Sequence, residues 1–375
     1  MKNLFLAAAM IPMIYASAQD TDDQIKDLQA QIQEIRVMAE SRQVGAQSPA
    51  GYPKIEDAIG LRFELGGMYQ NAVLGATEYA FVVPNVTTTI SANFEGEMLL
   101  PEAKMGWGVN GSVSYYCKEH GYELKLRNSY FDLSSSSFYG VNVDQNVLFP
   151  LNYADPDVIT SIDAKAVSSS LGITYDLLGL ELQKSFYVNR YFNIDVIGGL
   201  LASWNWLTRS STYHEIYLFI EPEDPDWYLY RQDHSSWFGI GPELGINLNF
   251  MLGEGFSVFF NNTGALMYGK FDVKYYQECL YYDDLVVGNF LTHTDLKASD
   301  HRIMPYVQSF MGLAYEFFAG EDKNFLKIRA GYNTQYFISA NTMIRYDGDD
   351  VSQLYYRLNE NLQTQGLLFD LAWSF

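Results

Sequence analysis

The chain has 375 residues, of which 48% are hydrophobic and 16% aromatic, and its formal net charge is −21. This charge argues against a nucleic-acid partner, because few basic residues are present to neutralise phosphates. No internal run of about 18 apolar residues occurs, which excludes transmembrane helices. The aromatic excess, 29 Tyr and 24 Phe, is typical of the two aromatic girdles of a transmembrane β-barrel.

Residues 1–18 have the pattern of a secretory signal peptide. Lys2 precedes an apolar stretch at 4–15, and Ala16, Ser17 and Ala18 form an A-x-A cleavage site. The apolar stretch is too short to span a bilayer as an anchor. We therefore predict cleavage after Ala18 and export across the inner membrane.

Residues 19–43 are predicted to form a short periplasmic helix. Its apolar residues alternate at spacings of three and four, as in a heptad seam: Ile25, Leu28, Ile32, Ile35 and Ala39. Ile at both seam positions favours three strands, so one interpretation is a coiled coil that joins three copies of the chain. The other is a solvated or barrel-capping helix. Residues 44–60 contain the Gly, Pro and Ser typical of a linker.

From residue 61 to 375 the hydrophobicity alternates with a period of two, which predicts strands with one apolar and one polar face. The clearest case is the hairpin at 236–268, where apolar residues from Phe238 to Phe250 hold one parity. The predicted fold is all-β, a transmembrane antiparallel barrel of about ten strands. These strands are expected at 61–70, 107–117, 122–131, 167–182, 190–206, 236–250, 256–268, 302–317, 325–338 and 366–375.

The connections after the second, fourth, sixth and eighth predicted strands are short, and the alternate ones have roughly twenty residues or more. Short periplasmic turns and long outer loops are typical of outer-membrane barrels, with both termini periplasmic. In this orientation one set of aromatic residues lies at the outer rim: Trp107, Trp204, Trp206 and Tyr336. A second set lies at the inner rim: Tyr315, Phe317, Trp373 and Phe375.

One predicted strand changes parity. Within 167–182 the outward residues are first Leu171, Ile173, Tyr175 and Leu177, and then Leu178, Leu180 and Leu182. A β-bulge near residues 177–178 would produce this change.

The chain ends at Phe375, and Trp373 and Leu371 precede it at alternate positions. A terminal aromatic residue on an amphipathic strand resembles the signal that the barrel-assembly machinery recognises. The alternative is a closing strand whose last Phe is merely interfacial. Cys117 and Cys279 are expected at opposite ends of the barrel, unbonded within one chain, and they lack metal-ligand spacing.

Five segments, 178–192, 237–247, 255–273, 331–337 and 365–375, together resemble the Legionella major outer membrane protein family. The resemblance spans about 61–375. It implies a pore-forming barrel in the outer membrane of a Gram-negative-type bacterium, surrounded by outer-membrane lipid. It carries no catalytic signature.

Charged residues on the inward parity are expected in the lumen, because Arg or Lys at the bilayer midplane costs about 2–4 kcal/mol. The candidates for lining a pore are Arg62, Glu64, Glu123, Lys125, Arg127, Asp176, Glu181, Asp195, Glu243, Lys327, Arg329 and Asp370. They could line a hydrated pore and set its ion selectivity. Alternatively, acids and bases pair and fill the narrow lumen of a ten-stranded barrel.

The function expected is therefore passive passage of ions or small solutes, together with a structural role in the envelope. The alternative is a closed structural or adhesin barrel whose outer loops contact surfaces. A hydrolase is the third candidate, since Asp233 with His234, or Asp300 with His301, could activate water. Acids are so abundant in these loops that chance proximity explains such pairs. We expect no enzymatic activity, metal or cofactor.

Overall fold

The computed structural model describes residues 60–84, 96–102, 104–117, 122–142, 146–150, 162–189, 191–218, 228–283, 288–319, 324–349 and 352–374. The predicted signal peptide, the predicted helix, the linker up to residue 59 and Phe375 lie outside these residues. No helix in the described part of the chain is long and apolar enough to cross a bilayer.

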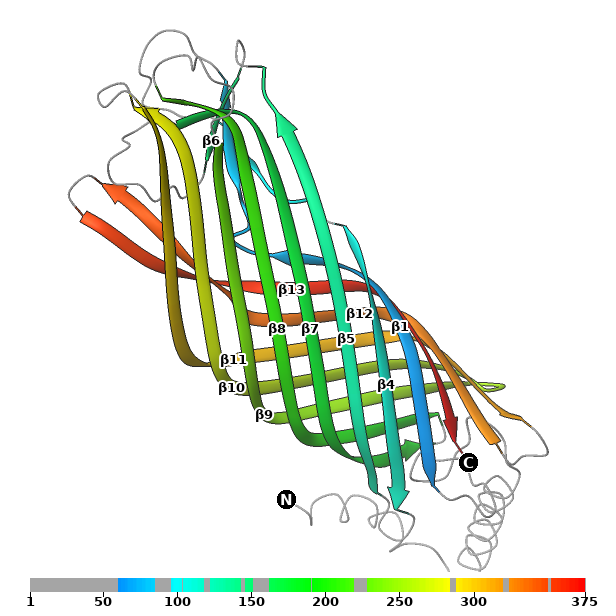
Figure 1. The fold of residues 1–375 in the computed structure, drawn as a ribbon. Coiled ribbons are helices and arrows are strands. Elements are labelled where there is room, and N and C mark those ends of the chain that lie inside the picture. Colours follow the sequence, from blue (N-terminus) through cyan, green and yellow to red (C-terminus); the bar gives the residue numbers. More distant parts are fainter. Residues whose placement is uncertain are drawn as a thin grey trace, which may run out of the picture.

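The described residues form thirteen strands in one antiparallel sheet (Figure 1). Ten of them close into a ring, because β8 pairs with both β9 and β7. The ring strands are β1 (Leu61–Leu74), β4 (Met105–Cys117), β5 (Tyr122–Gly140), β7 (Ile162–Asn189), β8 (Phe192–Leu218), β9 (Tyr228–Gly253), β10 (Phe256–Asp283), β11 (Gly288–Ala319), β12 (Asn324–Asp349) and β13 (Ser352–Ser374). The predicted all-β barrel is confirmed.

Three short strands lie outside the ring and were not predicted. They are β2 (Ala80–Pro84), β3 (Glu97–Leu99) and β6 (Asn146–Pro150). β2 pairs with β3 and β6, and β6 meets β7 at Leu148 and Ala164. The predicted count of about ten strands is therefore too low for the whole sheet. The three were missed because they are only three to five residues long, too short for an alternating pattern to be recognised.

The ring is narrow. Following paired residues once around it from Val73 leads back to Leu61, a shift of twelve residues. With a rise of about 3.4 Å per residue and about 4.8 Å between strands, this shift tilts the strands by about 40°. The radius is then about 10 Å, so inward side chains from opposite walls meet at the axis.

One end of the barrel holds the start of β1, the end of β13 and the turns that follow β7, β9 and β11; we call it the turn end, and the opposite end the mouth (Figure 1). Between β9 and β10 the chain turns at Gly253, Glu254 and Gly255, all with positive φ. Glycine tolerates this backbone conformation at two of the three positions.

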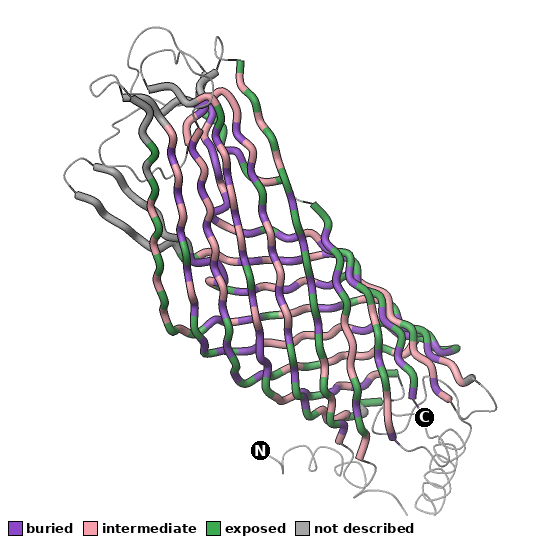
Figure 2. The backbone as a smooth tube through the Cα atoms, in the orientation of Figure 1, coloured by how far each residue is buried: buried purple, intermediate pink, exposed green. Residues whose placement is uncertain are grey.

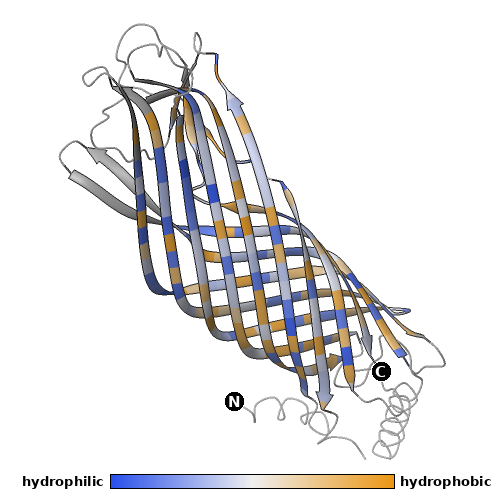
Figure 3. Ribbon diagram, viewed as in Figure 1, coloured by the Kyte–Doolittle hydropathy of each residue, from blue (hydrophilic) through white to orange (hydrophobic). Residues whose placement is uncertain are grey.

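Buried and exposed residues alternate along the ring strands, as do hydrophilic and hydrophobic ones (Figures 2 and 3). Outward aromatic rings gather at two levels. At the turn end Phe256 lies 4.6 Å from Tyr315, and near the mouth Tyr69 lies 4.5 Å from Trp107. Trp204 packs on Phe238 at 5.0 Å. These two girdles bound an apolar belt, as in a membrane barrel.

The long outer loops predicted after residues 206, 268 and 338 are wrong. There β8, β10 and β12 continue to Leu218, Asp283 and Asp349, and only residues 219–227, 284–287 and 350–351 lie between the described strands. Beyond the girdle the outer face meets water, so it has no need of apolar residues. The period-two signal therefore fades although the strands go on.

The predicted bulge near residues 177–178 is also wrong. β7 pairs with β5 in unbroken register through this region. Leu171, Ile173, Tyr175 and Leu177 are buried inside, whereas Leu178 faces out. The strand is apolar on both faces here, because the interior at this level is apolar as well.

Because side chains pack closely on the inner face of the wall, adding a methyl group should lower the free energy of unfolding there but not on the outer face. A Cβ added at Gly108 of β4 would lie 2.7 Å from Met68 Cε and 2.6 Å from the Tyr130 carbonyl oxygen. Gly108→Ala should lower the free energy of unfolding by about 1–3 kcal/mol, as overpacking does. Gly67, beside it on β1, faces out with no atom within 4 Å of an added Cβ, so Gly67→Ala is the matched control. Urea unfolding in lipid vesicles compares them; equal costs would contradict close inward packing.

Candidate functional site

The interior of the ring has a charged layer near the turn end. Eleven of the twelve predicted lumen residues point inward; the exception is Asp176, which shares the outward face of β7 with Leu178 and Leu180. The prediction for Asp176 is therefore wrong. Its neighbours in register are Tyr130 and Trp204, so it lies at the outer aromatic girdle, where water reaches a carboxylate. Its placement in the lumen depended on the bulge that does not form.

Acids and bases of this layer pair across strands. Arg127 of β5 binds Glu181 of β7 and Glu243 of β9. Arg329 of β12 binds Glu64 and Asp370, the latter at 2.7 Å. Such charge-assisted pairs compensate the desolvation of each member.

Two lysines complete the charged layer. Lys125 Nζ lies 2.8 Å from Glu64, and Lys327 Nζ lies 2.7 Å from Glu316, an acid that sequence reasoning did not select. The layer surrounds a cavity of about 140 Å³ whose lining includes Asp195, Asn247 and Asn261. This volume holds several water molecules. The turn-end half of the lumen thus contains a small polar chamber that is lined by ion pairs.

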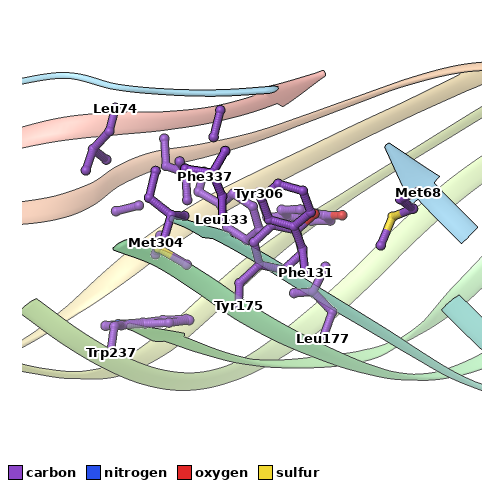
Figure 4. Packing of buried hydrophobic residues seen from close by; sticks show 14 of the residues in the cluster. Met68, Leu74, Phe131, Leu133, Tyr175, Leu177, Trp237, Met304, Tyr306 and Phe337 are labelled. Carbon is purple, nitrogen blue, oxygen red and sulfur yellow. The ribbon is translucent and has the colours of Figure 1, made fainter. Parts of the chain in front are cut away.

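Above this chamber the lumen is filled by an apolar layer, which we call the plug. Four rings form its centre: Phe131 lies 5.2 Å from Tyr175, Tyr175 lies 5.3 Å from Phe337, and Phe337 lies 4.8 Å from Tyr306 (Figure 4). They come from β5, β7, β12 and β11, on different sides of the ring, and at most 1% of each is exposed. The same cluster contains Met304 of β11 and, from three further strands, Met68 of β1, Trp237 of β9 and Leu362 of β13. The plug therefore spans the lumen.

Sequence reasoning missed the plug, although a signal was present. On β5 the inward parity runs Glu123, Lys125, Arg127 and then reaches Phe131 and Leu133. A change from charged to apolar residues on the same parity indicates a change of layer inside the barrel. The period-two pattern instead predicts that the apolar residues of β7 face lipid.

A third layer, the lid, covers the mouth side of the plug. It consists of Tyr79 with β2, β3 and β6, and its buried residues pack on Tyr213, Leu229 and Cys279, which face inward from β8, β9 and β10. Cys117 lies at the turn end, so the two cysteines are at opposite ends of the barrel, as predicted.

The lid is attached by a buried arginine. Arg209 of β8 donates from Nη1 to the carbonyl oxygens of Ala76 and Glu78, both at 3.1 Å. Asp233 accepts from the Nε of Arg209 at 3.1 Å and pairs with Arg231 at 3.0 Å. Arg209, Arg231 and Asp233 are all buried, and their opposite charges compensate one another. We call Arg209, with its bonds to the two carbonyl oxygens, the latch.

Replacement of the latch residue should loosen the lid selectively. In Arg209→Met the carbonyl oxygens of Ala76 and Glu78 lose their donor, so amide hydrogens of 75–84 should exchange at least tenfold faster. The control is Lys165→Gln, which removes an exposed pair with Glu215. Hydrogen exchange by mass spectrometry measures both. Unchanged exchange in Arg209→Met would contradict the latch.

The predicted His–acid pairs do not assemble. Asp233 faces inward to Arg209, whereas His234 faces outward and lies 3.1 Å from Thr208 Oγ1. His301 and Asp300 likewise sit on opposite faces of β11, because neighbours in a strand alternate. Neither pair can share one water molecule.

The fold and the filled interior define the class: an antiparallel transmembrane barrel of the outer-membrane type, with layered side chains in its lumen. The sequence model of the Legionella pneumophila major outer membrane protein precursor family matches residues 54–375. The chain belongs to this family, and it is a protein of the outer membrane.

Comparison with other known proteins adds distant likenesses. No curated protein matches the chain. Among solved structures, the outer membrane protease OmpT from Escherichia coli is similar at 8% identity and a TM-score of 0.37, over 87% of this chain and 100% of that one. A Pseudomonas aeruginosa FadL homologue has 9% identity and a TM-score of 0.29, over 88% and 93%. The Pseudomonas putida toluene transporter TodX has 9% identity and a TM-score of 0.22, over 88% and 92%.

Proposed function

We propose that this chain is a structural barrel of the outer membrane whose lumen is closed at rest. The observation that carries the proposal is the plug, in which four aromatic rings from four strands form a chain across the axis, each ring at most 5.3 Å from the next. A water-filled path needs polar or hydrated walls along its whole length. The plug offers neither, and the lid packs against inward residues of the wall on its mouth side.

The charged chamber supports a second candidate function, gated passage of small cations. Its inward residues comprise seven acids, Glu64, Glu123, Glu181, Asp195, Glu243, Glu316 and Asp370, and five bases, Arg62, Lys125, Arg127, Lys327 and Arg329. An excess of acids favours cations in a narrow pore. Passage then requires that the plug move. The porin-like prediction is thus retained in a gated form.

Permeation into proteoliposomes tests the closed state. Vesicles that contain the full chain should lose a trapped pentose no faster than protein-free vesicles do. Correct insertion is verified by the shift in electrophoretic mobility between unheated and heated samples. Leakage that rises in proportion to the number of chains per vesicle would contradict a closed barrel and support an open porin.

A further inference from the structure

A row of basic residues crosses the outer surface of β9, β10 and β11 beyond the outer aromatic girdle. His234, Lys274 and Lys297 stand directly opposite one another in register. They share the outward parity of Tyr268, a residue that is 59% exposed. The chain as a whole has 45 acids and 24 Lys and Arg, so this basic row is a local exception.

Ion pairs in and beside the row leave the positive charge of Lys274, at its centre, uncompensated. Lys270 pairs with Asp272 at 2.7 Å and Lys297 with Asp295 at 2.9 Å, along each strand. Both pairs are about half exposed, so each contributes little. Among the described residues, Lys274 makes no ion pair. Like charges directly opposite on a sheet face destabilise it, unless an anion lies between them.

The row lies at the height of lipid headgroups. Lys270 is in register with Phe238 of the outer girdle, which marks the membrane interface. Lys274 is four residues further along β10, which at a tilt of about 40° places it about 10 Å above Lys270. Thr208 continues the row beyond His234. The next register row towards the membrane contains Ser236, Asp272 and Ser299, and Lys270 pairs with the Asp272 carboxylate.

We propose that the basic row of His234, Lys274 and Lys297 binds a phosphate group of a phosphorylated glycolipid in the outer leaflet. The positive charge of the row complements the negative charge of a phosphorylated headgroup. Tyr268 and Leu266 continue the same face into the apolar belt, where the acyl chains of the lipid would lie. The inference depends on the orientation expected from the sequence, in which both termini are periplasmic and the mouth is therefore outside, but not on whether the lumen is closed.

Native mass spectrometry of the full chain in detergent micelles tests the inference, with bis-phosphorylated lipid A, dephosphorylated lipid A and inorganic phosphate as probes. Wild type should retain bis-phosphorylated lipid A. Each lysine near a charged lipid surface contributes about fivefold to affinity, so Lys274→Gln with Lys297→Gln should weaken binding about 25-fold. The Lys274→Arg, Lys297→Arg double variant keeps the charge and should bind as wild type.

The matched control is Lys184→Gln, which removes one outward lysine on β7 near the turn end, where it lies over the Tyr122 ring at 4.4 Å. It should leave binding unchanged. Equal retention of lipid A by the double Gln variant and wild type would overturn the inference, as would equal binding of dephosphorylated lipid A. Competition by inorganic phosphate at concentrations equal to the lipid would also overturn it, because the row would then be an ion site only.

Discussion

Replacing Arg127 by Met is expected to lower the free energy of unfolding by about 3–5 kcal/mol, because it leaves buried carboxylates without their cation. Arg127 lies inside the ring and pairs with both Glu181 and Glu243, whose side chains are at most 5% exposed. Met fills a similar volume, so lost packing contributes little. Urea unfolding in lipid vesicles, followed by tryptophan fluorescence, measures the change.

A triple variant without the two carboxylates separates the cost of uncompensated charge from the cost of altered packing. Glu181→Gln and Glu243→Gln on the Arg127→Met background remove the uncompensated charges, and should restore most of the lost stability, since neutral replacement of a whole buried pair is often close to neutral. Lys165→Gln, which breaks an exposed pair, should cost below about 1 kcal/mol. Equal costs for Arg127→Met and Lys165→Gln would contradict a desolvated ion-pair layer.

Removing the centre of the plug should make the barrel leak. In a variant with Tyr175→Ala, Tyr306→Ala and Phe337→Ala, three rings that meet across the axis disappear. Pentose efflux from proteoliposomes should rise at least tenfold, and small cations should pass in preference to anions, since acids outnumber bases in the chamber below. Each large-to-small change costs about 3–5 kcal/mol, so folding is verified by circular dichroism and gel mobility.

The control for the plug variant is Leu244→Ala. Leu244 faces outward on β9 and is 73% exposed, so its removal alters the lipid face and leaves the lumen intact. Its efflux should equal that of wild type. A folded plug variant that retains pentose as wild type does would show that the lid or the ion-pair layer alone closes the barrel.

The sequence predicts the membrane part of this fold well, because lipid on one face and polar groups on the other impose a strict period of two. The hairpin at 236–268 shows this: Glu243 was expected inside, and the structure buries it against Arg127. Outside the belt the constraint disappears. The predicted strand at 302–317 is therefore the inner half of β11, which extends from Gly288 to Ala319.

The plug could not be predicted from the same rule, because the rule assumes a polar interior. Tyr175 and Asp176 illustrate the failure: an apolar lumen reverses the expected parity, and the rule then places a carboxylate of the girdle inside. Contacts between distant strands, such as Tyr175 with Phe337, also depend on ring closure and register, which no local pattern specifies. The pairing of Arg127 with Glu181 and Glu243 also depends on ring closure and register, so no local pattern predicts it.

The most direct test of the closed barrel is the current through single molecules of the full chain in planar bilayers, at both polarities in 1 M salt. The plug variant serves as the control for insertion, and should show steady steps of conductance. Wild type, inserted under the same conditions, is predicted to show none. Steady single-channel steps from wild type would contradict the closed lumen and restore the open porin.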